Sequence, residues 1–155
     1  MLSIVEGNVF DQLRPGDIFV HGCNCMGVFG RGVAQDVKHK WPEAYHAYKS
    51  SVRGYRLGEY SMVFIPYDDI FVVNALTQQF YGSNKSIVYA DYDAIRKVFV
   101  DISTVAISFL PSSRIVFPFV GAGLANGDKI KLLSIFEDVF DTEESPEGVL
   151  VVQLE

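Results

Sequence analysis

The sequence predicts an α/β fold in which a central mixed β-sheet lies between two layers of helices. Short apolar runs alternate along the 155-residue chain with longer stretches whose apolar residues recur every three or four positions, a pattern typical of strands alternating with helices. The runs at residues 61–65 and 70–76 are too continuously apolar for a sheet that is wetted on one face, so we expect helices on both faces. The length favours a single domain, residues 1–155, that is large enough for a full core.

Apolar spacing and turn residues predict the position of each element. We expect strands at residues 2–5, 17–20, 61–65, 70–76, 114–119 and 149–154, and helices at residues 32–41, 42–54, 88–109 and 129–140. Pro42 separates the first two helices and Pro111 ends the third, because proline does not continue a helix. Residues 7–10, 14–17 and 67–69 are expected to form turns, and residues 77–86 and 143–148 longer polar connections.

Composition excludes several classes of protein. The net charge is −6 and no block of Lys and Arg stands out, which disfavours tight binding to long nucleic acid. A small nucleotide stays possible, since backbone amides hold a diphosphate without net positive charge. No apolar run approaches the ~20 residues that span a bilayer, and the N-terminus has no signal-peptide pattern. The two cysteines lie two residues apart, so we expect no disulfide framework and a cytoplasmic location.

Two glycine-rich segments each follow a predicted strand. The first glycine loop, residues 21–34, contains Gly27, Gly30 and Gly32, and the second glycine loop, residues 121–128, contains three further glycines. Glycine lets the backbone approach a ligand, and the amides at a helix start attract anions. Either loop alone is equally well explained as a flexible turn. Two such loops at strand ends favour one cleft with two phosphate-binding walls.

Three side chains of the first glycine loop alternate and therefore share one face of an extended strand. They are His21, Cys23 and Cys25, which suit a metal site, a redox pair with a histidine, or simple packing. Zinc needs a fourth ligand, and His39 and His46 lie on predicted helices away from this face. We expect packing and no bound metal.

Other polar side chains have two interpretations each. His21 is either a core residue with a satisfied ring or the group that titrates near neutrality at the mouth of the cleft. Asn24 either orients a ribose hydroxyl or braces its loop. Asp128 is well placed to cap the following helix and, compatibly with that role, to position a water molecule.

The polar and aromatic loop at residues 77–86 adds three further candidates. Lys85 either covers the ligand or is solvated, and Phe80 and Tyr81 either offer a stacking surface or fill a gap beneath the loop.

Three segments carry a resemblance to a known family. They are Ile4-Val5-Glu6-Gly7-Asn8, the first glycine loop, and Gly121-Ala122-Gly123-Leu124. Together they resemble the macro domain family, which binds ADP-ribose, and the resemblance spans essentially the whole chain. The pattern His-x-Cys-Asn-Cys-x-Gly, with residues 76–83, is most similar to the branch that contains the yeast-type ADP-ribose 1''-phosphate phosphatases and their phage and bacterial relatives.

The resemblance implies a role for each loop. The first glycine loop would wrap the distal ribose, with Asn24 touching it, and residues 120–125 would hold the diphosphate through backbone amides. Asn8 stands where the family has an aspartate that receives the adenine amino group, and its amide oxygen still accepts that hydrogen bond.

Two departures from the family bear on the reaction. Related enzymes that remove ADP-ribose from protein glutamate use a lysine in the segment that matches residues 77–79 and an aspartate at the position of Ala125, whereas this chain has Gln78, Gln79 and Ala125. This puts the glutamate-directed reaction in doubt. Arg31 replaces a residue that is often small, and its guanidinium would suit a terminal phosphate, or it points to solvent.

The leading hypothesis is a macro domain that binds ADP-ribose and hydrolyses ADP-ribose 1''-phosphate to ADP-ribose and phosphate, without an obligatory metal or cofactor. Asn24 would be part of the catalytic group, with His21 as acid and base, Asp128 orienting the water and Arg31 neutralising the phosphate. The expected ligand-binding residues are Gly7, Asn8, Val9, Asn24, Gly27, Gly30, Arg31, Gly32, Val33, Phe80, Val120, Gly121, Ala122, Gly123, Leu124 and Ala125. Two alternatives stay open: a reader of ADP-ribose or ADP-ribosylated macromolecules that catalyses nothing, and a hydrolase that removes ADP-ribose from modified protein or nucleic acid.

Overall fold

The computed structural model describes residues 2–141 and 148–153. Its elements in chain order are β1 (Leu2–Glu6), the short 3-10 helix η1 (Val9–Gln12), β2 (Ile18–Asn24), α1 (Gly32–Lys40), α2 (Pro42–Ser51), β3 (Tyr60–Ile65), β4 (Ile70–Gln78), α3 (Tyr92–Phe109), β5 (Ile115–Pro118), α4 (Lys129–Phe140) and β6 (Val149–Gln153). Among the described residues, no helix has both the length and the apolar character that crossing a membrane requires.

The six strands form one sheet in the order β1-β6-β5-β2-β4-β3. Strands β1, β6, β5, β2 and β4 run parallel to one another, and β3 runs antiparallel to β4 at the edge. The mixed sheet is therefore confirmed.

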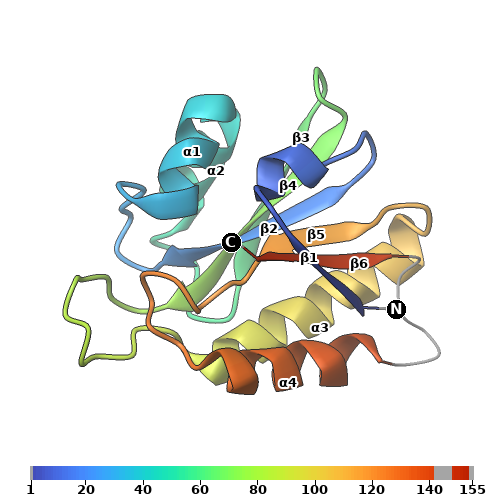
Figure 1. The fold of residues 1–155 in the computed structure, drawn as a ribbon. Coiled ribbons are helices and arrows are strands. Elements are labelled where there is room, and N and C mark those ends of the chain that lie inside the picture. The colour runs from blue at the N-terminus through green and yellow to red at the C-terminus, as the bar shows by residue number, and fades with distance from the viewer. Residues whose placement is uncertain (1, 142–147, 154–155) are drawn as a thin grey trace.

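Helices cover both faces of the sheet, so the three-layer arrangement is also confirmed. Figure 1 shows α1 and α2 on one side and α3 and α4 on the other. On the first side, η1 joins the helices, and Phe19, Trp41 and Tyr48 are fully buried in a shared core. On the second side, Phe99 of α3 and Phe136 of α4 pack on Phe117 of β5, with ring centroids 4.5–5.2 Å apart.

The parallel strands decide where the functional loops lie. Because β2, β4 and β5 run in the same direction, their carboxyl ends meet at one edge of the sheet, and the loops that follow them are neighbours. Figure 1 shows these loops together at the left of the molecule.

The predicted elements are all present where the structure describes the chain, with shifted ends in a few places. Strand β2 continues three residues beyond His21 because it keeps pairing with β4 as far as Asn24 and Gln78. Helix α3 begins at Tyr92, not at residue 88, because the Asp91 side chain accepts the amide of Ala94 and caps the helix there. The predicted turn at residues 7–10 leads into η1. Most of the connection predicted at residues 143–148 lies outside the described residues.

Candidate functional site

The two glycine loops contact each other although they are far apart in the sequence. A Cβ atom added to Gly32 would lie 3.3 Å from Cδ1 of Leu124, and one added to Gly22 would lie 3.2 Å from Cγ1 of Val120. The first pair joins the start of α1 to the second glycine loop, and the second pair joins β2 to the end of β5. The structure thus brings the two predicted walls together.

The second glycine loop is closed by a hydrogen bond between two of its glycines. Gly127 donates its amide to the carbonyl of Gly121 at 2.6 Å. Gly121 has a φ of 89°, and a Cβ atom there would lie 2.9 Å from Cδ1 of Ile95. A Cβ atom on Gly127 would collide with the Gly121 carbonyl. Only glycine allows the loop to close this tightly on the core.

Free amides gather where the loops meet. The backbone N–H groups of Gly121, Gly123, Leu124 and Ala125 donate to none of the residues that the structure describes. Helix α1 begins beside them at Gly32. Arg31, the residue before it, provides no side-chain cap, and the first turn of the helix contains no acidic residue. An uncapped helix start carries partial positive charge. This arrangement can hold an anion such as a diphosphate.

Asn24 holds the first glycine loop in shape. Its Oδ1 accepts the amide of Met26 at 2.9 Å, and its Nδ2 donates to the carbonyl of Val28 at 2.9 Å. The Tyr48 hydroxyl donates to the Asn24 carbonyl at 2.7 Å, and burial raises the pKa of Tyr48 well above its usual value. These contacts correspond to the bracing interpretation of Asn24.

His21 lies beneath the loops with no exposed surface. Its Nε2 donates to Oδ1 of Asn74 at 2.6 Å, its ring stacks on Phe19, and it forms a T-shaped pair with Phe29 in which the ring centroids are 5.2 Å apart. Burial lowers the pKa of His21 to about 4, although the Asn74 hydrogen bond opposes that shift. A neutral ring closed off from solvent cannot exchange protons with a ligand at the loops. This geometry favours the core interpretation over the acid–base one.

The alternating cysteines are packed on the same side of β2 as His21. Cys23 is buried, and burial raises the pKa of its thiol well above the usual value, while Cys25 is half-buried and its thiol pKa is also raised. A thiol that resists ionisation is a poor nucleophile and metal ligand. In the described part of the chain, no three His, Cys, Asp or Glu side chains are grouped so as to hold a metal ion.

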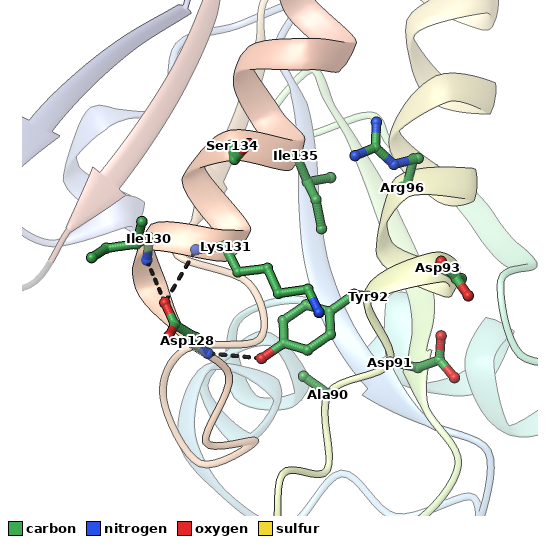
Figure 2. Close-up of a pocket in the computed structure, with 10 residues that line it drawn as sticks. All are labelled: Ala90, Asp91, Tyr92, Asp93, Arg96, Asp128, Ile130, Lys131, Ser134 and Ile135. Carbon is green, nitrogen blue, oxygen red and sulfur yellow. Dashed lines mark hydrogen bonds between the residues drawn. The ribbon is translucent and has the colours of Figure 1, made fainter.

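Asp128 caps α4, as predicted. Its Oδ1 accepts the amides of Ile130 at 2.9 Å and Lys131 at 3.1 Å. Asp128 lines an open hollow of about 790 Å³. Figure 2 shows the residues that line it, which come largely from the first turns of α3 and α4. The residues that line this hollow include none of the first glycine loop, and the hydrogen bonds that the Asp128 side chain accepts come from the first turn of α4, not from Asn24 or His21.

The remaining predicted residues lie around the same edge of the sheet. Asn8 caps η1, with its Oδ1 accepting the amide of Phe10 at 2.9 Å. Arg31 is exposed and forms no ion pair with any described residue. Phe80 and Tyr81 are also exposed, and Lys85 is solvated at the surface.

The sequence did not point to three supporting residues, which are Asn74, Asn126 and Tyr48. Asn74 bonds His21 and also donates to the Ala44 carbonyl and the Ser61 hydroxyl, each at 3.0 Å. Asn126 donates to the carbonyls of Asn84 and Ile87 and so ties the β4–α3 connection to the second glycine loop. Asn74 could have been noticed in the sequence, because it is a polar residue inside an apolar run. No comparable signal pointed to Tyr48 or to the partners of Asn126.

Two solved structures share the fold of this chain over nearly their full length. The macrodomain of Mycobacterium tuberculosis DarG superposes with a TM-score of 0.79 at 20% identity, covering 97% of both chains. A macrodomain protein from Streptomyces coelicolor gives a TM-score of 0.77 at 23% identity, covering 98% of both chains. This chain has the macro-domain fold.

A third structure with this fold holds a ligand. Thermosipho africanus DarTG in complex with ADP-ribose matches this chain with a TM-score of 0.77 at 16% identity, over 99% of this chain and 41% of that one.

Curated relatives of this chain fall into two groups. An uncharacterized 17.5 kDa protein of Enterobacteria phage T4 is 24% identical over the whole chain and 97% of its own length. An ADP-ribose 1''-phosphate phosphatase of Aspergillus oryzae is 38% identical over 52 residues, which are 34% of this chain and 25% of that protein. The match therefore spans about a quarter of that enzyme. No family model matches the chain.

Proposed function

We propose that this macro domain binds ADP-ribose across the two glycine loops and hydrolyses ADP-ribose 1''-phosphate to ADP-ribose and phosphate. The observation that carries the proposal is the contact between Gly32 and Leu124, which sets the free amides of the second glycine loop beside the uncapped start of α1. The neighbour in complex with ADP-ribose and the partial matches to ADP-ribose 1''-phosphate phosphatases support it. We further propose that residues 1–155 act as one domain.

The diphosphate would lie on the backbone at this contact. The free amides of Gly121, Gly123, Leu124 and Ala125 and the first turn of α1, with Gly32 and Val33, supply donors and partial positive charge without a lysine or an arginine. Gly27 and Gly30 would let the distal ribose approach the first glycine loop. Asn24 would act as a positioning residue that fixes this loop from below.

The adenosine end would lie near β1. Gly7, Asn8 and Val9 directly follow that strand, whose carboxyl end is on the same edge of the sheet. The Asn8 oxygen that caps η1 has a second lone pair, and in our proposal it accepts the adenine amino group. Phe80, 62% exposed, would provide a stacking surface.

Phosphate release would depend on charge stabilisation at the loops. Phosphoryl transfer leaves a protein mainly positioning and electrostatics to supply. In our proposal Arg31, exposed at the start of α1, and the loop amides neutralise the reacting phosphate. Asp128 would hold the end of the second glycine loop through its cap. His21 is left out of the reaction because it is sealed in the core.

A non-catalytic reader of ADP-ribose is the second candidate. Gln78, Gln79 and Ala125 supply no charge beside the loops, and His21 and Asp128 are both engaged in structural contacts. Binding needs only the backbone donors, whereas turnover needs Arg31 or another charged group as well.

Calorimetric titration with ADP-ribose tests the binding site. Gly123→Ala is an informative variant because a Cβ atom there meets nothing within 4 Å in the free protein, so the fold accepts it. The added methyl group should obstruct a ligand lying on the loop and weaken binding by about ten-fold or more. Gly54→Ala, whose nearest new contact is 3.7 Å away in the turn after α2, is the matched control and should bind as the wild type does.

Phosphate release from ADP-ribose 1''-phosphate separates the two candidates. We expect turnover by the wild type and a strong loss in Arg31→Gln with little change in ADP-ribose affinity. Binding of ADP-ribose without turnover would support the reader function and contradict the phosphatase function. No binding of ADP-ribose at millimolar concentration would contradict both functions.

A further inference from the structure

A second hollow, of about 480 Å³, lies beside the Gly27 end of the first glycine loop. It is lined by Cys25, Val52, Arg53, Tyr55, Arg56, Leu57 and Gln79. We refer to it as the arginine hollow. Its walls are the end of β2, the turn after α2 and the start of the β4–α3 connection.

The arginine hollow is adjacent to the proposed ribose site. A Cβ atom on Gly27 would lie 3.7 Å from Cγ1 of Val52, and the amide of Cys25 donates to the carbonyl of Gln78 at 3.0 Å. The first glycine loop therefore touches the second glycine loop at its Gly32 end and the arginine hollow at its Gly27 end. A group attached to a ribose at the Gly27 end of this loop would therefore lie next to the hollow.

The charge of the arginine hollow is distinctive. Its lining includes two arginines and no carboxylate, in a protein whose net charge is −6. Arg53 and Arg56 are exposed, and neither forms an ion pair with any residue that the structure describes. The larger hollow in Figure 2 differs, because Asp91, Asp93 and Asp128 balance its cations.

We infer that the arginine hollow is a phosphate subsite, in which Arg53 and Arg56 bind a terminal phosphate monoester that lies beside the distal-ribose position. The inference rests on the proposed function and names a specificity determinant for it. Guanidinium groups present paired donors to phosphate oxygens, and Gln79 adds an amide donor at the rim. Arg31 would act on the same substrate from the Gly32 end of the loop, so Arg53 and Arg56 contribute to affinity and Arg31 to turnover.

The phosphate has two chemical sources. It is either the 1''-phosphate of ADP-ribose 1''-phosphate or the phosphate at the end of a short nucleic acid. Both are phosphate monoesters with one or two negative charges, so the arginines would contact the same kind of oxygen in each.

Competition against a fluorescent ADP-ribose analogue, read within seconds of mixing, tests the subsite whether or not phosphate is released. The competitors are ADP-ribose, ADP-ribose 1''-phosphate and a 5'-phosphorylated dinucleotide. The variant is Arg53→Gln with Arg56→Gln, and the control is Arg96→Gln with Lys131→Gln, which removes two positive charges from the hollow in Figure 2. Matching thermal midpoints establish that both proteins are folded.

We expect the Arg53/Arg56 variant to bind ADP-ribose within about two-fold of the wild type and a phosphorylated competitor about ten-fold more weakly. A loss confined to ADP-ribose 1''-phosphate assigns the subsite to the substrate's own phosphate, and a loss confined to the dinucleotide assigns it to a nucleic-acid end. Unchanged affinity for both phosphorylated competitors overturns the inference while ADP-ribose binding stands. If the wild type fails to bind ADP-ribose, the proposed function on which this inference rests is itself contradicted.

Discussion

At the scale of single residues, burial decides what a titratable side chain does. His21 and Asp128 were both candidates for proton or water chemistry. His21 is enclosed between Phe19 and Phe29 and bonded to Asn74, while Asp128 uses one oxygen to cap α4. The cap was predictable because its partners are two and three residues away. The burial of His21 was not, because Asn74 is 53 positions away in the sequence.

The depressed pKa of His21 makes the stability of the fold depend on pH. The folded-state pKa of His21 is about 4, below the ordinary value of about 6.5. Between these two pH values the His21 imidazole is protonated in the unfolded chain and neutral in the folded chain. The free energy of unfolding should therefore fall as pH drops from 6.5 to 4, by on the order of 3 kcal/mol from this residue. Urea unfolding across this pH range measures the slope.

The His21→Gln variant should lose this part of the slope, and His39→Gln, at an exposed position of α1, should keep it. Because His21→Gln could unfold outright, the imidazole ¹⁵N shifts of the wild type provide a second measurement. An imidazolium signal from His21 in the folded protein at pH 6 would contradict the expected protonation state.

At the scale of elements, an ion pair fixes the end of the sheet that lies opposite the glycine loops. Arg114, directly before β5, donates to both carboxylate oxygens of Asp17, directly before β2, at 2.9 and 2.6 Å. Its Nη2 also donates to the carbonyl of Gln12 at the end of η1, and the Asp17 pair raises the pKa of Arg114. The pair sets two neighbouring parallel strands and η1 in register.

Removing Arg114 should destabilise the fold strongly. In Arg114→Met the Asp17 carboxylate, whose side chain is 3% exposed, loses its partner while still buried, which costs about 3–5 kcal/mol in proteins. Denaturant unfolding should show this loss. In the double variant Asp17→Asn, Arg114→Met, the loss should be smaller than the sum of the single losses.

The matched comparison for this pair is Arg96→Met. Arg96 pairs with Asp138 at 3.3 Å with both side chains largely exposed, so its loss should cost no more than about 1 kcal/mol. Equal costs for Arg96→Met and Arg114→Met would refute the role given to the buried pair.

At the scale of the whole molecule, the direction of the strands collects the functional loops at one edge. The first glycine loop follows β2, the aromatic connection follows β4 and the second glycine loop follows β5, and all three strands are parallel. Hydrogen bonds then lock these loops to one another, with the amides of Tyr89 and Ala90 both donating to the carbonyl of Ala125. A ligand bound across the loops would hold the two helical layers together.

ADP-ribose should therefore raise the thermal midpoint of the protein. At a ligand concentration 100 times the dissociation constant, the stabilisation is about 2.7 kcal/mol, which corresponds to roughly 5–10 °C for a domain of this size. Differential scanning calorimetry of the wild type and of Gly123→Ala provides the test. AMP, which lacks the second phosphate and the distal ribose, should give a smaller shift, and equal shifts for both ligands would argue against binding across both loops.

The sequence by itself determined the α/β class, the three layers, the position of nearly every element and the Asp128 cap. These features follow from apolar periodicity and from contacts between residues that are close in the chain. It also located both glycine loops, because glycines after an apolar run mark a strand end. Only the tertiary structure decided that Gly32 meets Leu124, that Tyr48 braces Asn24, and that Arg53 and Arg56 share a hollow with Cys25. Those facts depend on strand order and register, which arise from packing between segments far apart in the chain.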